Sequence, residues 1–300
     1  MTSSRPASAF TLRQGLPGGW HVCDATNRIL AGVGHNAHRA WAFPFNTPRG
    51  VNTVQEYAFD HPFHNGLFVG QGNVRQGGRM ANFWAVHADF RQATNPAMND
   101  LGHLRYDRDP QAAATPDGAR FTYRTTWLAV DGTPMLDEER IWIVRDLGDA
   151  TLVEIASAKT AAYGEVECGV TKFGSIGARV QPQLLPMCGG QVVALDGADV
   201  RRGLADEVAA GRACDAVAYE AEIPRLGRAG LCLVIAGNTA SPDRRGPWFL
   251  RDYGMAMFNP TMRDAVRIAD AATWSVALRC FAYDGAITPE RFAAWQRAAQ

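Results

Sequence analysis

The chain has 300 residues, of which 47% are hydrophobic and 20% charged, and its 30 basic residues balance its 30 acidic ones. Because no positive excess attracts phosphates or anionic lipid, we expect neither nucleic acid nor a membrane as a partner. The N-terminus lacks a signal-peptide core, and no stretch approaches the roughly 20 apolar residues of a membrane span. We therefore expect a cytoplasmic protein that binds a small neutral or polyhydroxylated molecule, such as a carbohydrate.

Alternation of apolar and polar residues, which is typical of half-buried strands, runs through most of the chain. In "RFTYRTTWLAV" (120–130), for example, Phe121, Tyr123 and Trp127 fall on one face. Turn residues such as "DGTP" (131–134) separate this run from the next. In chain order, strands are expected at 20–25, 28–34, 66–72, 79–90, 120–130, 135–149, 150–160, 190–195, 216–223, 230–237, 253–258 and 273–285.

Helical patterns are sparse. The segment 199–213 has room for a short helix interrupted at both of its glycines. A better helix is expected at about 288–300, where Thr288 can cap the first turn and Pro289 suits the first helical position. A dozen or more short strands with one terminal helix predict an all-β fold, a large antiparallel β-sandwich that forms one domain over residues 1–300.

The six cysteines are widely separated and form no Cys-x-x-Cys motif. This spacing excludes a zinc ribbon and a thioredoxin-like site, and in a cytoplasmic protein it indicates reduced thiols. We expect all six to be free and buried or half-buried, namely Cys23, Cys168, Cys188, Cys214, Cys232 and Cys280.

The segment "DHPFHNG" (60–66) is the first candidate site. Pro62 lies between His61 and His64, so the pair cannot sit in a helix as in a metalloprotease. At a loop or strand end the two imidazoles can still converge, and Asp60 can accept a hydrogen bond that fixes one tautomer. Three uses remain open: proton transfer or substrate contact without a metal, a structural role, or a divalent metal held by His61, His64 and His103.

Three further segments carry candidate residues. "GVGHNAHRAW" (32–41) repeats the histidine spacing with His35 and His38. "TKFGSIGARV" (171–180) supplies the cations Lys172 and Arg179 beside two glycines, unless it is only a kinked edge strand with solvated cations.

"RRGPWFLRDYGMAMFNP" (244–260) combines aromatic rings with planar polar groups, a pairing that suits sugar faces and hydroxyls. Its candidate residues are Trp248, Arg251, Tyr253 and Asn259. The structural alternative is a core tryptophan beside a surface ion pair.

Four stretches in order, "DHPFHNGLFVGQGNV", "GSIGARVQP", "PWFLRDYGMAMFNP" and "LRCFAYDG", resemble the PmoA-like family, which carries the label methane oxygenase. Asp60, His61 and His64 match the family pattern Asp-His-Pro-His-His-Arg-Gly, whereas Phe63 and Asn65 replace its central histidine and its arginine. The resemblance implies a β-sandwich similar to the galactose-mutarotase-like supersandwiches, and it implies sugars, often oxidised ones, as partners.

The leading functional hypothesis is a carbohydrate-active enzyme, a C–O lyase, hydratase or hydrolase, that acts on a sugar or keto-sugar glycoside. A keto group acidifies its neighbouring C–H, so a histidine base and a cation near the enolate oxygen would suffice. The expected catalytic residues are His61, His64, Arg179 and Lys172, and the expected substrate contacts are Trp248, Arg251, Tyr253, Asn65, Asn259 and His38.

Three alternatives stay open: a mutarotase-like epimerase, a non-catalytic sugar-binding or oxidoreductase-partner protein, and an oxygenase as the family label suggests. No cofactor follows from the sequence beyond the divalent metal considered above. The oligomeric state, including a homo-oligomer, is also left open.

Overall fold

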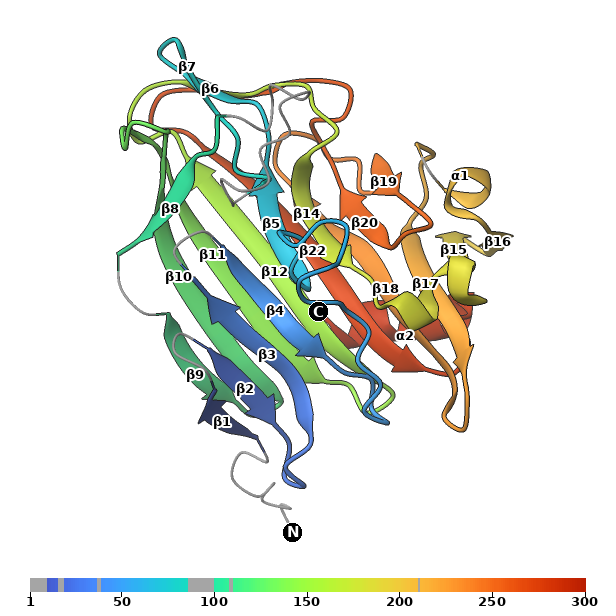
Figure 1. The fold of residues 1–300 in the computed structure, drawn as a ribbon. Coiled ribbons are helices and arrows are strands. Elements are labelled where there is room, and N and C mark those ends of the chain that lie inside the picture. Colours follow the sequence, from blue (N-terminus) through green and yellow to red (C-terminus); the bar gives the residue numbers. More distant parts are fainter. Residues whose placement is uncertain (1–9, 16–18, 37–38, 86–99, 108–109, 210) are drawn as a thin grey trace.

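A computed structural model describes residues 10–15, 19–36, 39–85, 100–107, 110–209 and 211–300. It is a β-sandwich in which two large sheets pack face to face, with every pair of neighbouring strands antiparallel (Figure 1). The predicted all-β sandwich class with a short C-terminal helix is thus confirmed.

The smaller of these two sheets has eight strands and carries the candidate site. Its spatial order is β1 (Thr11–Gln14), β2 (Trp20–Cys23), β3 (Ile29–His35), β4 (Ala40–Phe45), β5 (Leu67–Gln71), β14 (Gly174–Arg179), β20 (Met255–Phe258) and β19 (Trp248–Leu250). Strands from both halves of the chain therefore meet at β5, β14 and β20.

The larger sheet has ten strands and forms the other layer. Its order is β16 (Asp199–Gly203), β15 (Gln191–Asp196), β17 (Ala216–Ile223), β18 (Gly227–Asn238), β22 (Thr273–Asp284), β12 (Ala150–Thr160), β11 (Pro134–Asp146), β10 (Gly118–Leu128) and β8 (His103–Tyr106), with β9 (Gln111–Thr115) also paired to β10. A third, four-stranded sheet consists of β21 (Val266–Ile268), β13 (Val166–Cys168), β6 (Val74–Gln76) and β7 (Arg79–Ala81).

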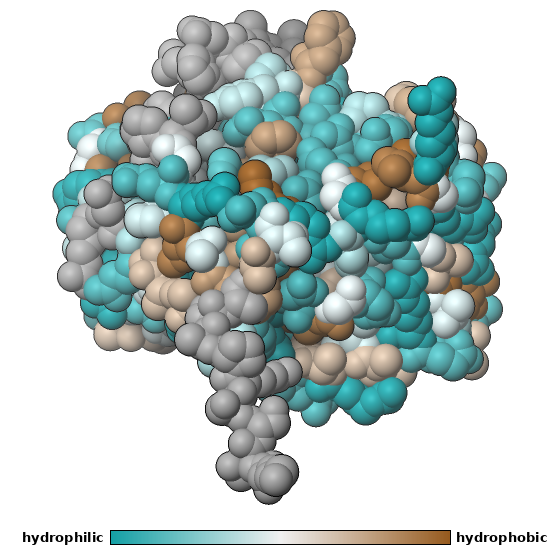
Figure 2. Space-filling model, turned by 90° about the horizontal axis from the view of Figure 1, so that it is seen from below, coloured by the Kyte–Doolittle hydropathy of each residue, from teal (hydrophilic) through white to brown (hydrophobic). Residues whose placement is uncertain are grey.

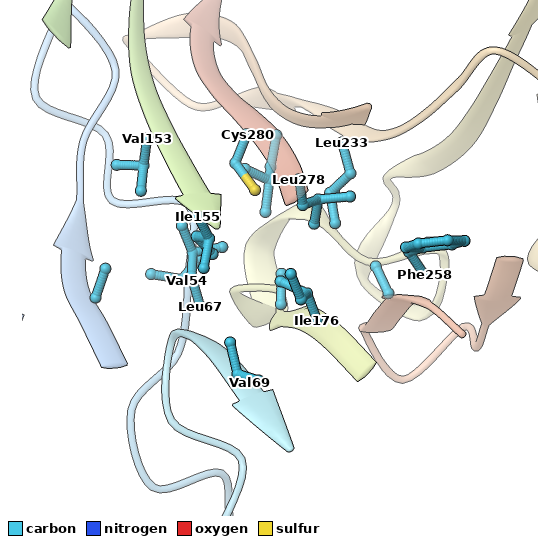
Figure 3. Packing of buried hydrophobic residues seen from close by; sticks show 14 of the residues in the cluster. Val54, Leu67, Val69, Val153, Ile155, Ile176, Leu233, Phe258, Leu278 and Cys280 are labelled. Carbon is cyan, nitrogen blue, oxygen red and sulfur yellow. The ribbon is translucent and has the colours of Figure 1, made fainter. Parts of the chain in front are cut away.

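The main core lies between the two large sheets, where alternate residues of each strand face inward. Figure 3 shows this packing: Val153, Ile155 and Leu278 of the larger sheet approach Leu67 and Ile176 of the smaller one. On the face shown in Figure 2, hydrophilic residues cover most of the surface and the hydrophobic ones form small separate patches. The apolar faces of the strands are thus mostly buried in the interior.

The helices are few. Between β16 and β17 lies α1 (Ala205–Val208), and η3 (Pro182–Leu184) and η4 (Pro186–Cys188) are single 3-10 turns. The predicted terminal helix is α2 (Pro289–Ala298), which Thr288 caps by accepting a hydrogen bond from the Arg291 amide. Its Trp295 stacks on Phe281, 5.3 Å between ring centroids, so α2 covers part of the outer face of the larger sheet. Neither α1 nor α2 has the length and apolar character needed to cross a membrane, among the residues described.

Most predicted strands are confirmed, with three differences. In the segment 79–90 only β7 is a strand, and 86–90 lie outside the described residues. The segment 199–213 begins with β16, and the expected helix is reduced to the four residues of α1. The alternative of an edge strand at 171–180 is wrong, because β14 lies between β5 and β20 with all six residues buried.

All six cysteines are free, as predicted, and five are buried. The expectation that all six would be buried or half-buried fails at Cys188, which is exposed. Cys188 is the last residue of the short turn η4, none of whose residues is buried.

Candidate functional site

The candidate site lies on the outer face of the smaller sheet. Along β5 and β20, alternate residues turn inward to the main core, while Phe68, Met255 and Met257 turn outward into a separate apolar cluster. Gly177 of β14 lies among them, and a Cβ atom there would come within 2.9 Å of the Met255 side chain. The alternation therefore places apolar side chains over the centre of the sheet, and the glycine lets Met255 pack closely against β14.

A cavity of about 200 Å³ opens over this cluster. Aromatic residues dominate its wall, and its charged groups are all cationic or imidazole. The lining residues are His61, Phe63, His64, Trp84, Lys172, Phe173, Phe249, Arg251, Tyr253 and Met255. A small pocket with apolar walls and a few converging polar groups is the usual form of a ligand site.

Asp60 joins His61 to Arg179 at the edge of this cavity. The Nδ1 atom of His61 lies 2.9 Å from one oxygen of Asp60, and the guanidinium of Arg179 pairs with the other oxygen. Burial alone would raise the pKa of Asp60, but the hydrogen bond from His61 and the charge of Arg179 outweigh it and lower that pKa. Asp60 is therefore a carboxylate that orients the His61 ring and leaves its Nε2 free to act.

A column of parallel rings supports His61. Its ring is parallel to that of His64 at 4.8 Å and to that of Tyr253 at 5.8 Å, with interplanar angles of 3° and 7°. The guanidinium of Arg179 lies over the Tyr253 ring at 4.9 Å. These contacts restrict the rotation of the imidazole, so its orientation is set by packing as well as by Asp60.

His64 is a buried neutral group and not an equivalent of His61. It is only 2% exposed, and neither ring nitrogen has a hydrogen-bond partner in the part of the chain that the structure describes. Burial lowers the pKa of His64 well below its ordinary value, and the charges of His61, Arg39 and Arg179 act in the same direction. His64 is thus held uncharged beneath the cavity.

This burial predicts a pH-dependent stability. Around pH 6 the unfolded chain protonates His64 and the folded protein does not, so the unfolded state binds the extra proton. The full unfolding free energy is therefore present above about pH 7. As the pH falls, the protonation of His64 in the unfolded chain lowers it by up to ~1.4 kcal/mol per pH unit. We expect His64→Phe to flatten the slope of unfolding free energy between pH 7 and pH 5, measured by urea titration. An unchanged slope would show that His64 is not held neutral.

Arg39 fixes the wall of the cavity from below. It is 1% exposed, and its guanidinium donates hydrogen bonds to the backbone carbonyls of Phe63 and Trp84 and lies over the Phe68 ring at 4.4 Å. Burial, helped by the charge of Arg140, lowers the pKa of Arg39 to about 9. It therefore ties the histidine loop to the segment that carries Trp84.

Two cations lie at the cavity beside aromatic rings. Lys172 Nζ is 5.2 Å from the Phe173 ring centroid, and the Arg251 guanidinium is 4.2 Å from that of Phe249. Arg251 also lies 3.7 Å from Asp206, whose side chain is 81% exposed. Because solvent screens this pair, the interaction is weak, and Arg251 can still form an ion pair with a ligand.

The structure brings together six of the residues that the sequence singled out. His61, His64, Lys172, Arg251 and Tyr253 line the cavity, and Arg179 reaches it through Asp60 and Tyr253. Arg179 itself is 4% exposed and does not line the cavity, so it positions Asp60 instead of facing a ligand.

The structure contradicts three of the predicted substrate contacts, Trp248, Asn259 and Asn65. Trp248 is fully buried and donates to the Cys214 carbonyl at 3.2 Å, so it belongs to the core. Asn259 is also buried, and its amide donates to the Thr171 carbonyl at 2.8 Å. Asn65 is buried as well and does not line the cavity. His38 lies outside the described residues.

The metal hypothesis gains no support from the donor set. His103 lies on β8, opposite Leu128 of β10 in the larger sheet, and does not line the cavity with His61 and His64. Within the described ranges, no group of three or more His, Cys, Asp or Glu residues is arranged to hold a metal ion.

Sequence reasoning missed the aromatic wall, which consists of Phe63, Trp84, Phe173 and Phe249. Phe63, Phe173 and Phe249 each lie within two residues of a residue that was singled out. That adjacency was the available signal. Arg39 directly follows the candidate His38 and carried the same signal, whereas Trp84 carried none.

Comparisons with known proteins describe relatives of this chain. A family model described as "Family of unknown function (DUF6807)" matches residues 32–296. No curated protein gave a significant match to the sequence. The methane-oxygenase label suggested by the motif resemblance finds no support in these matches.

One similar solved structure is the alpha-galactosidase from Lactobacillus brevis, with 11% sequence identity and a TM-score of 0.41. The match covers 94% of this chain but 40% of that one, so this chain spans well under half the length of that enzyme.

Proposed function

The chain belongs to this DUF6807 family, and we propose that it is a carbohydrate-active enzyme that breaks or forms a C–O bond in a sugar or keto-sugar glycoside. The observation that carries the proposal is the Asp60–His61 pair at a cavity with aromatic walls and two cations. Aromatic rings stack on the apolar faces of sugars, and a carboxylate-oriented histidine is a general base.

The proposed reaction begins with proton transfer. The Nε2 atom of His61 takes a proton from a carbon next to a carbonyl group, and the electron pair moves toward the carbonyl oxygen. Lys172 or Arg251 stabilises the negative charge that develops there. The β C–O bond then breaks and its oxygen takes up a proton, which completes an elimination. In the reverse direction, water adds to the double bond of the product, which is a hydration.

Either histidine was a candidate base, and the geometry favours His61. It is half-buried at the cavity and hydrogen-bonded to Asp60, whereas the buried His64 has no carboxylate partner among the described residues. His64 supports the His61 ring from beneath through their stacking contact. We therefore assign the catalytic role to His61 and the positioning role to Asp60 and Arg179.

Isotope exchange tests the proposal against its alternatives. The protein is incubated in D₂O with a panel of glycosides and 3-keto-glycosides, and NMR follows both deuterium uptake at ring carbons and release of the leaving group. We expect uptake at the carbon next to the carbonyl together with release. Faster interconversion of the anomers of a free reducing sugar, with no deuterium uptake at carbon, would indicate a mutarotase-like enzyme, because ring opening breaks a C–O bond and no C–H bond. Saturable binding with neither exchange nor release would indicate a sugar-binding protein and contradict the proposal.

A further inference from the structure

We infer that the ligand of this cavity carries a carboxylate, which makes a uronic-acid glycoside the best-fitting substrate class. This inference rests on the proposed function, because it names the group that would activate the C–H bond. It departs from the neutral partner that the balanced overall charge suggests.

The charge of the lining is the first argument. Its ten residues include Lys172, Arg251 and His61, and none is an aspartate or glutamate. Asp60 is already neutralised by Arg179. Buried His64 adds no charge of its own. The local balance is therefore positive, although the chain as a whole is neutral.

The neighbouring acids do not cancel this charge. Asp206 is well solvated at 3.7 Å from Arg251, and Asp252 accepts a hydrogen bond from the Ala205 amide at 2.8 Å. Lys172 has no carboxylate within ion-pair distance among the described residues. An arginine fork and a lysine ammonium together suit a planar carboxylate.

The chemistry of the base is the second argument. A carboxylate neutralised by Lys172 and Arg251 acidifies the C–H bond on its α carbon, which in a uronate is C5. His61 takes the C5 proton, the electron pair forms the C4=C5 double bond, and the C4–O bond breaks. The departing alkoxide takes a proton from the Tyr253 phenol or from water. Burial raises the pKa of Tyr253, so its hydroxyl is protonated at neutral pH. No oxidant or metal is needed.

A sugar phosphate would satisfy the same charges but not this chemistry, because a phosphate ester does not acidify a ring C–H for His61. The binding experiment therefore includes a sugar phosphate as a competing ligand. The cavity, about 200 Å³, has room for the uronate ring, and the group that leaves from C4 would extend beyond it.

Calorimetric binding at low salt supplies the experiment. The ligands are methyl glucuronide, methyl galacturonide, the two matched neutral methyl glycosides, and glucose 6-phosphate. We expect one uronide to bind at least about tenfold more tightly than its neutral counterpart. Lys172→Gln and Arg251→Gln should each remove most of that difference. Arg120→Gln, which removes one exposed charge from β10, should leave it unchanged.

Two results overturn the inference: equal affinity for uronides and neutral glycosides, or tighter binding of glucose 6-phosphate than of either uronide. The titrations are repeated on His61→Gln, and turnover of the wild type is measured separately. Binding then tests this inference, and turnover tests the proposed function. A uronide preference in the wild type, with no release of the C4 substituent from a 4-O-glycosylated uronide, supports the inference and contradicts the enzyme. Turnover of neutral glycosides alone supports the enzyme and contradicts the inference.

Discussion

Replacing His61 by glutamine is expected to lower turnover by about 10²- to 10⁴-fold, because the site then lacks its general base. Glutamine keeps a polar group of similar reach beside Asp60, so the loop and the cavity should persist. The measurement is kcat for the best substrate of the glycoside panel, with sugar binding followed by calorimetry.

The matched control for this variant is His21→Gln, a half-buried histidine on β2 that does not line the cavity. Its kcat should stay within about twofold of the wild-type value, as expected for a site away from the chemistry. A His61→Gln protein that retains full kcat would assign the chemistry to another group. Loss of binding together with kcat would make His61 a ligand contact only.

Replacing Glu138 by glutamine is expected to destabilise the fold by about 3–5 kcal/mol, because it breaks a buried ion pair from one side. Glu138 is 3% exposed and accepts hydrogen bonds from Arg140 at 2.7 and 3.0 Å and from the Trp127 indole at 2.8 Å. Burial opposes its ionisation, but the charges of Arg140 and Lys159 lower the pKa of Glu138 to about 2. Glutamine would leave the buried guanidinium without a counter-charge.

Glu139 supplies the control for Glu138, since it is the next residue and points to the opposite face of β11. It pairs at the surface with Arg124, 3.1 Å away, and its side chain is 43% exposed. Glu139→Gln should therefore cost less than about 1 kcal/mol in urea unfolding. Equal losses for the two variants would contradict the buried-pair explanation.

The strands of the sandwich were largely predictable because their period-two pattern is local. In β10, Phe121, Tyr123 and Trp127 are all buried on the predicted face. The position of a strand within its sheet was not predictable in the same way. The glycines of β14 favoured a kinked edge, but Gly177 instead permits close packing against Met255 in the middle of the sheet.

The candidate site was predictable in its parts and not in its assembly. His61, Arg179 and Tyr253 come from segments far apart in the chain, and only the pairing of β14 with β5 and β20 brings them together. The indole of Trp248 is a ring type that can stack on a sugar. However, Trp248 lies on the inward face of β19 and is therefore part of the core. Which aromatic residue faces the ligand depends on strand register, and no local motif specifies that register.

Imidazole ¹⁵N NMR of His61 tests the central claim most directly. With ¹⁵N-histidine protein and the tightest ligand of the panel, we predict that the Nδ1 resonance keeps the protonated form bonded to Asp60 while the Nε2 resonance shifts on binding. His61→Gln identifies the signals by their loss. If saturating ligand leaves Nε2 unshifted, or if the proton resides on Nε2, then His61 is not the base that faces the ligand.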